Sequence, residues 1–209
     1  MKQHRKMFQF VEEILYSYDR RKGDKSKNKI AYDRYAHTLR VYQWMLRICD
    51  RLCDENMDRE SLKIATIFHD AGYSAGGDCN HAEESARICR DYLERRSYEP
   101  AQIDFICYLI EEHPNKRLLH EKATPLELVV LMEADMLDDT GAMGIILDSW
   151  IASKEDNPTF DSVCRHFEKY TYRQMKQMEF VTAPGRQFWH EKRKLVYEFL
   201  RQYRRDLGR

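Results

Sequence analysis

Apolar residues recur with a period near 3.6 along almost the whole chain of 209 residues, which is the spacing of one face of an α-helix. Strand-like alternation is nearly absent, and only eight Gly and five Pro interrupt the pattern. The sequence therefore predicts an all-α protein. A chain of this length can bury one core of ordinary size. We expect a single domain over 1–209, with a core at about 30–152 and a helical C-terminal part at about 159–206.

Helix start and stop signals divide the chain further. Asp58, Asn80 and Asp138 are expected N-caps, and Thr124–Glu127 reads as a capping box with Pro at the first helical position. A turn is expected at Ala183–Gly185, which contains Pro184. The expected helices cover about 4–19, 32–54, 58–71, 81–96, 100–114, 125–137, 140–152, 159–178 and 186–206.

Composition narrows the classes of partner. The formal net charge is +0, with 43% hydrophobic and 33% charged residues, so neither stable nucleic-acid binding nor a membrane partner is expected. No apolar run approaches the roughly 20 residues of a membrane span, and the basic, amphipathic N-terminus lacks the features of a signal peptide. We expect a cytoplasmic protein. Its six scattered cysteines form no Cys-x-x-Cys pattern and are interpreted as buried free thiols. The sequence does not predict an oligomeric state.

Several polar residues interrupt the core-facing apolar stripes of the expected helices. Asp70 directly follows one of them in the chain. Burying carboxylates without partners is costly, and several imidazoles and carboxylates are hard to satisfy by one another. A divalent metal satisfies them all, because imidazole nitrogen and carboxylate oxygen are suitable ligands. The residues do not decide among Mn, Fe, Ni, Mg and Zn. The residues on the stripes are His37, His69, His81, His113 and Asp135.

The order of His37, His69-Asp70 and Asp135 resembles that of the HD-domain superfamily of metal-dependent phosphohydrolases. The surrounding sequences AHTLRVYQW, ATIFHDAGY and LMEADMLDDTGAMGI carry the resemblance. Farther along, HFEKYTYRQMKQM and APGRQFWHEKRKLVYEFLRQYRRDL are similar to the C-terminal helices of a small bacterial branch. The resemblance spans about 30–206. It implies an HD-domain helical bundle with additional C-terminal helices.

The resemblance also implies roles for individual residues. The four metal ligands would be His37, His69, Asp70 and Asp135. His81 and His113 match the extra histidines of members with two metals, in which the aspartate of the HD pair bridges the metals. Asp70 would then be the bridge and the catalytic residue. The chain departs from the small bacterial branch in its Gly-rich loop after Asp70, which lacks the acidic residues expected there, and at Met136, where a basic residue is usual.

These features predict hydrolysis by a metal-activated water of a phosphoester or phosphoanhydride bond. The substrate would be a nucleotide or another small phosphorylated molecule. Arg40 lies three residues after His37, on the same helix face, and Lys116 and Arg117 follow His113. All three are candidates for phosphate binding, and ordinary surface charge is the alternative interpretation.

Two other functions fit the same residues. The ligand order also resembles the di-iron oxygenase branch of the superfamily, typified by inositol oxygenase. A non-catalytic binding module that retains the fold and the metal is the third hypothesis. The complete ligand set disfavours that module, and the C-terminal helices favour the hydrolase.

Overall fold

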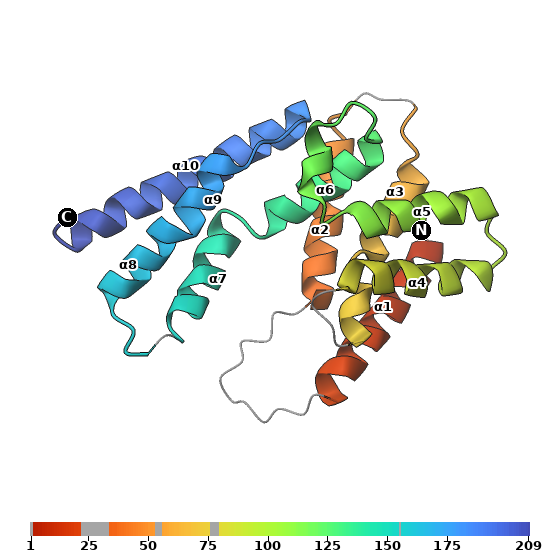
Figure 1. Cartoon of the computed structure of the whole chain (residues 1–209), viewed down its shortest axis with the longest axis horizontal. Coiled ribbons are helices and arrows are strands. Elements are labelled where there is room, and N and C mark those ends of the chain that lie inside the picture. The colour runs from red at the N-terminus through yellow and green to blue at the C-terminus, as the bar shows by residue number, and fades with distance from the viewer. Residues whose placement is uncertain (1, 22–33, 53–55, 76–79, 155) are drawn as a thin grey trace. The chain divides into compact units, whose positions relative to one another are not determined.

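A computed structural model describes residues 2–21, 34–52, 56–75, 80–154 and 156–209 of the chain. Within these ranges the ordered elements are helices and no strand is present, so the prediction of an all-α protein is confirmed for them (Figure 1). The helices form two compact units, Met1–Ala134 and Asp135–Arg209. The boundary falls inside one helix, α6 (Leu126–Asp138). The single domain expected over 1–209 stays a prediction.

The first unit is built around α3, which contacts α1, α2, α4 and α5. Leu62, Ile64, Ala65, Ile67 and Phe68 of α3 are all fully buried, because this short helix is apolar on nearly every side. A helix of this kind belongs at the centre of a bundle. The elements of the unit are α1 (Lys2–Arg21), α2 (Arg34–Cys49), α3 (Arg59–Phe68), the 3-10 helix η1 (Ala71–Ala75), α4 (His81–Glu94), α5 (Pro100–Glu112), the 3-10 helix η2 (Lys116–His120) and the first part of α6.

The start of α3 is capped as predicted. The carboxylate of Asp58 accepts a hydrogen bond from the Ser61 N–H at 3.0 Å. The predicted capping box at Thr124 is wrong. The Thr124 hydroxyl donates to the carbonyl of Leu118 at 2.7 Å, and Glu127 accepts a hydrogen bond from the Asp58 N–H at 2.6 Å. Glu127 therefore joins the beginning of α6 to the beginning of α3 instead of capping its own helix.

The second unit contains the end of α6, then α7 (Ala142–Ala152), α8 (Phe160–Lys169), α9 (Thr171–Gln177) and α10 (Ala183–Asp206). One helix was expected over 159–178, but the chain bends at Tyr170, between α8 and α9. The Thr171 hydroxyl at this bend donates to the carboxylate of Asp148 on α7. This tertiary contact accompanies a break that no Gly or Pro marks in the sequence.

Two boundary predictions in the second unit also fail. The expected turn at Ala183–Gly185 is the first turn of α10, because Thr182 caps that helix by accepting from the Gly185 N–H at 2.9 Å. Pro184 then occupies the first turn, where its missing N–H costs nothing. Asp138 ends α6 and does not cap α7, whose N-cap is Gly141 with φ +67°.

No helix among the described residues has both the length and the apolar character needed to cross a membrane. The cysteines Cys49, Cys89, Cys107 and Cys164 are buried free thiols, as predicted. Cys53 and Cys79 lie outside the described residues, as does the part of the expected loop 72–79 that follows η1.

Candidate metal centre

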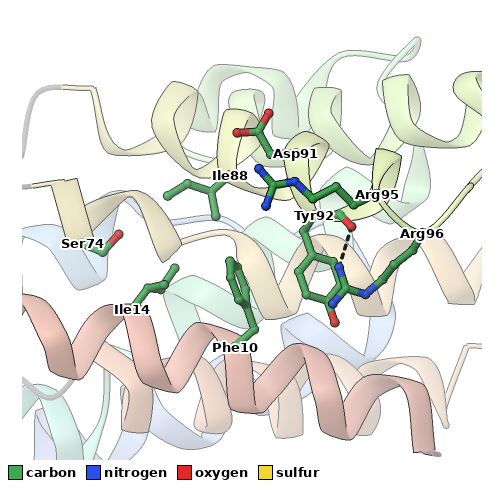
Figure 2. Close-up of a pocket in the computed structure, with 8 residues that line it drawn as sticks. All are labelled: Phe10, Ile14, Ser74, Ile88, Asp91, Tyr92, Arg95 and Arg96. Carbon is green, nitrogen blue, oxygen red and sulfur yellow. Dashed lines mark hydrogen bonds between the residues drawn. The ribbon is translucent and has the colours of Figure 1, made fainter.

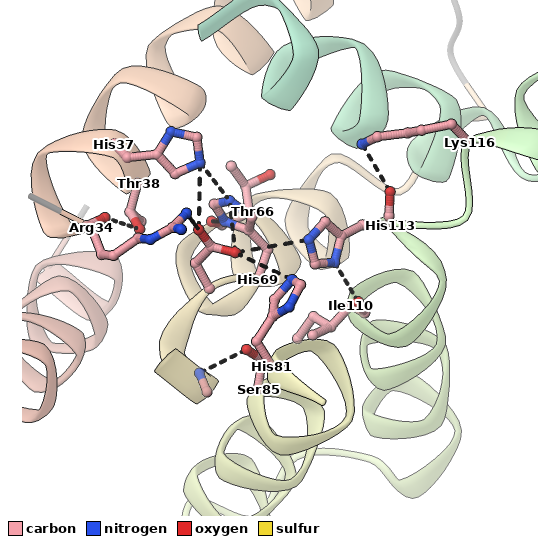
Figure 3. A network of polar contacts seen from close by, with 12 residues as sticks. Arg34, His37, Thr38, Thr66, His69, His81, Ser85, Ile110, His113 and Lys116 are labelled. Atoms are coloured by element: carbon pink, nitrogen blue, oxygen red, sulfur yellow. Dashed lines mark hydrogen bonds and ion pairs between the residues drawn. The ribbon is translucent and has the colours of Figure 1, made fainter. Parts of the chain in front are cut away.

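Asp70 lies where α3 has ended and η1 begins, and its carboxylate is almost completely buried. One carboxylate oxygen, Oδ2, lies 3.5 Å from Nε2 of His37 on α2. The same oxygen lies 3.2 Å from Nη1 of Arg34, one turn earlier on α2. These contacts bring α2 to the end of α3, and Figure 3 shows Arg34 and His37 on that side of the site.

The other carboxylate oxygen faces three more imidazoles. Oδ1 of Asp70 lies 3.7 Å from Nε2 of His69, 3.8 Å from Nε2 of His81 and 3.9 Å from Nε2 of His113. His81 begins α4, and His113 directly follows α5. Figure 3 shows these rings converging from separate helices. The structure thus brings five of the six predicted ligands into one cluster within the first unit.

Two of these histidines have their orientation fixed by their own helices. Nδ1 of His69 lies 2.8 Å from the carbonyl oxygen of Thr66, and Nδ1 of His113 lies 2.6 Å from that of Ile110. A carbonyl oxygen can only accept, so Nδ1 carries the proton in both rings. Nε2 of each ring then faces the cluster, and it can bind a metal when the imidazole is neutral.

The donor set fits metal ions. His37, His69 and Asp70 form one group that could hold a metal, and Asp70, His81 and His113 form another, with ligand atoms within 4.8 Å of one another in each group. Nε2 of His69 also lies 3.3 Å from Nε2 of His37, so these two nitrogens are close enough to bind one ion. Asp70 belongs to both groups.

The charge state of Asp70 is set by two opposing effects. Burial alone raises the pKa of the Asp70 carboxyl group. The rings of His69, His37 and His113 and the guanidinium of Arg34 outweigh burial, and they hold that pKa below its ordinary value. The carboxylate is therefore ionised, which is the form that binds metal.

Close packing of η1 on α4 places His81. The Gly72 N–H donates to Ser85 Oγ at 2.8 Å. A Cβ on Gly72 would lie 2.1 Å from the carbonyl oxygen of His81 and 2.7 Å from the Ser85 nitrogen. Only glycine lets the backbone after Asp70 come this near to the start of α4.

The remaining predicted residues lie as follows. Asp135 stands on α6, where the second unit begins, and its role as a ligand stays a prediction. Arg40 is partly buried on α2, one turn after His37, and Arg117 is exposed on η2. Lys116 Nζ donates to the backbone carbonyl of His113 at 2.9 Å (Figure 3). Phosphate binding by these three cations stays a prediction.

Arg34 and Tyr73 are the site residues that the sequence analysis missed. Arg34 precedes His37 by three residues, so it shares that histidine's helix face in the same way as Arg40. The guanidinium of Arg34 lies over the ring of Tyr73, 3.8 Å from its centroid. The spacing from His37 was a usable signal for Arg34, whereas Tyr73 stands in a Gly-rich segment with no periodic pattern.

A cavity of about 580 Å³ lies elsewhere in the first unit. Phe10 and Ile14 of α1 face Ile88 and Tyr92 of α4 across it, and Arg95 and Arg96 stand at one end (Figure 2). None of its lining residues belongs to the cluster around Asp70. This cavity is therefore separate from the candidate metal centre.

Comparison with known proteins begins with a family model. The model for the HD domain matches residues 34–140 of the chain. Bifunctional uridylyltransferase/uridylyl-removing enzymes from Haemophilus influenzae and Pasteurella multocida are 33% and 32% identical over 66 residues. The match spans 32% of this chain and only 7% of the length of these curated relatives.

Solved structures resemble the chain over nearly its full length. An HD-superfamily hydrolase from Bacillus thuringiensis is 20% identical with a TM-score of 0.70, covering 100% of this chain and 99% of that one. Bacillus subtilis YpgQ in complex with ADP is 20% identical with a TM-score of 0.67, covering 98% and 95%. A predicted HD-superfamily hydrolase from an uncultured Thermotogales bacterium is 22% identical with a TM-score of 0.63, covering 98% and 92%. At these identities the likeness shows a shared fold.

Proposed function

The chain belongs to the HD-domain family, and from this premise we propose that it is a metal-dependent phosphohydrolase. Its substrate would be a nucleotide or another small phosphorylated molecule, cleaved at a phosphoester or phosphoanhydride bond. One observation carries the proposal. The buried carboxylate of Asp70 is shared by two groups of potential metal ligands, one containing His37 and His69 and the other containing His81 and His113.

We assign the ligands in two sets. His37, His69 and Asp70, with Asp135 as the predicted fourth ligand, would hold one metal, and Asp70, His81 and His113 would hold the second. A divalent metal in such a site lowers the pKa of water, polarises a phosphoryl oxygen and orients the ester. Manganese, iron, nickel, magnesium and zinc remain the candidates, since nitrogen and oxygen ligands serve several of them.

The residues of the chain supply orientation and charge. Asp70 has two carboxylate oxygens with several lone pairs, so it can accept a hydrogen bond from the attacking water as well as bind metal. Lys116 lies against the backbone of His113, which brings a positive charge near the second set. We keep Arg40, Lys116 and Arg117 as the proposed phosphate-binding residues.

The relatives favour hydrolysis and a nucleotide substrate. One similar structure is of an HD-superfamily hydrolase, and another was solved in complex with ADP. The formal net charge of +0 agrees with a small substrate in place of a nucleic acid.

The test is an assay of the purified protein, stripped of metal and reloaded with Mn²⁺. It is incubated with nucleoside mono-, di- and triphosphates and cyclic nucleotides, and released phosphate and pyrophosphate are measured. We expect release from at least one nucleotide and loss of that release in Asp70→Asn. A metal-loaded protein that releases neither product from any member of the panel contradicts the proposal.

A parallel assay under anaerobic conditions separates hydrolysis from the chemistry of the di-iron oxygenases, which the same ligand order would serve. Hydrolysis needs no dioxygen, so the rate should be unchanged. Dioxygen uptake without phosphate release would replace the proposed activity by an oxygenase.

A further inference from the structure

We propose that a stack of three side chains, Arg34, Tyr73 and His81, positions the second set of metal ligands. Tyr73 is a positioning residue in this arrangement, because it acts on His81 and is not itself a ligand. The inference rests on the proposed two-metal site. It adds to that site a residue that controls one metal position and leaves the other unaffected.

The stack has two interfaces that share the ring of Tyr73. On one side the imidazole of His81 lies nearly parallel to it, with centroids 4.5 Å apart and an angle of 15° between the rings. The guanidinium carbon of Arg34 lies 3.8 Å from the same centroid. The phenol ring therefore contacts both a cation and an imidazole.

His81 is the most exposed of the four cluster histidines. Its side chain is 17% exposed, whereas those of His37, His69 and His113 are 0–3% exposed. The rings of His69 and His113 are also fixed by hydrogen bonds to their own helices. A ring at the first position of a helix, next to solvent, gains its orientation from the flat surface stacked against it.

The backbone fixes the position of Tyr73. Its N–H donates to the carbonyl of Asp70 at 3.2 Å, and the preceding residue, Gly72, packs directly against the first turn of α4. The backbone of Tyr73 is thus fixed to the backbone of Asp70, and its phenol ring stacks on the imidazole of His81. Displacing the ring would release His81 while leaving His37 and His69 in place.

Arg34 links the stack to the carboxylate. While its guanidinium face covers Tyr73, its Nη1 lies 3.2 Å from Oδ2 of Asp70. A planar guanidinium can make both contacts at once, and the compact ammonium of lysine cannot. Arg34 therefore contacts both the phenol ring that stacks on His81 and the carboxylate of Asp70.

These contacts predict how each metal position responds to substitution. Residues that orient a metal ligand without touching the metal typically contribute about 10–100-fold to metal affinity. Tyr73→Leu removes the flat surface and should weaken the second position by about that factor. Tyr73→Phe keeps the aromatic ring and should bind Mn²⁺ at the second position as tightly as the wild type does. In both variants the metal position formed by His37 and His69 should keep its affinity for Mn²⁺.

The experiment is a titration of metal-free protein with Mn²⁺. Calorimetry measures the heat of binding, and the electron paramagnetic resonance signal of free Mn²⁺ measures how much metal stays unbound. We expect two metals per chain in the wild type, with the weaker dissociation constant raised about 10–100-fold in Tyr73→Leu. Tyr108→Leu is the matched control, because Tyr108 is 37% exposed on α5 and is absent from the cluster. Thermal melting of each metal-free variant checks that the fold is retained.

Arg34→Lys provides a second variant should Tyr73→Leu fail to fold. It retains a positive charge beside Asp70 and loses the planar stack, so the second dissociation constant should rise by a larger factor than the first. Equal binding by folded Tyr73→Leu and wild type, or equal weakening in Tyr73→Phe and Tyr73→Leu, would overturn the proposal. A wild type that binds only one metal would instead refute the two-metal site of the proposed function.

Discussion

Nδ1 of His69 donates a hydrogen bond to the carbonyl oxygen of Thr66, three residues earlier, at 2.8 Å. His113 makes the same contact with Ile110 at 2.6 Å. Each histidine is the C-cap of its helix, α3 or α5, and the last carbonyls of a helix have no partner within it. The imidazole therefore satisfies a helix end and presents Nε2 to the metal centre with the same ring.

Loss of the shared carboxylate should affect both metal positions. Asp70→Asn removes the charge and the bridging oxygen, so we expect weaker binding at both positions and hydrolysis reduced by at least about 100-fold, the upper end of the effect of outer-sphere partners. His81→Ala should weaken only the second position. Calorimetric titration with Mn²⁺ measures the stoichiometry and the dissociation constants of both variants.

Asp104→Asn serves as the control for these two variants, because Asp104 is exposed and pairs with Arg90 on the surface. It should bind two metals. An Asp70→Asn protein with unchanged stoichiometry and affinity would show that Asp70 is not a ligand.

A methyl group on Gly72 should disturb the junction between η1 and α4. Gly72→Ala places a Cβ within 2.1 Å of the His81 carbonyl, so the backbone must shift. Overpacking of this kind typically costs about 1–3 kcal/mol. We expect a lower melting temperature and weaker binding at the second metal position.

Gly208→Ala is the companion variant, because nothing lies within 4 Å of a Cβ there. Its positive φ of +74° adds a local backbone cost of roughly 1–2 kcal/mol at most, far from the first unit in sequence, and metal binding should be unchanged. Wild-type melting and metal affinity in Gly72→Ala would contradict the close packing described.

Glu127 should matter for stability and not for metal binding. Its Oε1 accepts the Asp58 N–H at 2.6 Å, and the side chain is mostly buried. Glu127→Ala leaves that N–H without its partner, which costs about 1–3 kcal/mol. Urea denaturation should give a lower free energy of unfolding, while Mn²⁺ stoichiometry stays at the wild-type value. A Glu127→Ala protein of unchanged stability would show that the hydrogen bond contributes nothing.

The buried thiols should resist alkylation in the folded protein. Burial raises the pKa of Cys49 and of Cys107 to about 11, and it raises that of Cys89 well above the ordinary range. The thiolate is the reactive form. Because pH 8 lies below these pKa values, nearly all of each thiol is protonated there, and it loses its proton only as the pH rises towards them.

Peptide-resolved mass spectrometry after N-ethylmaleimide treatment at pH 8 measures this reactivity. All three cysteines should label within minutes in guanidinium and far more slowly without it. Fast labelling of Cys89 in the folded protein would contradict its burial.

Much of the first unit could be predicted from periodicity alone. His37, His69, His81 and His113 were identified because each interrupts an apolar stripe, and the structure brings all four to Asp70. The Asp58 cap was predictable because it depends on residues within one turn. Local patterns thus determine the helices and the faces that they bury.

The failed predictions depend on distant partners. Glu127 bonds to Asp58, 69 residues away, in place of capping its own helix. The bend at Tyr170 accompanies a contact between Thr171 and Asp148. The stack of Tyr73 on His81 likewise requires two elements to dock, so spacing in the sequence cannot reveal it.

The ligands around Asp70 come from α2, α3, α4 and the end of α5, a stretch from His37 to His113. An unfolded chain cannot hold these atoms together, so metal ions bind the native state in preference to the denatured ensemble. By mass action, free metal at 100 times its dissociation constant would add about 2.7 kcal/mol per site to the free energy of unfolding. The concentration of free metal in the surrounding solution would then set the stability of the folded protein as well as the occupancy of the candidate metal centre.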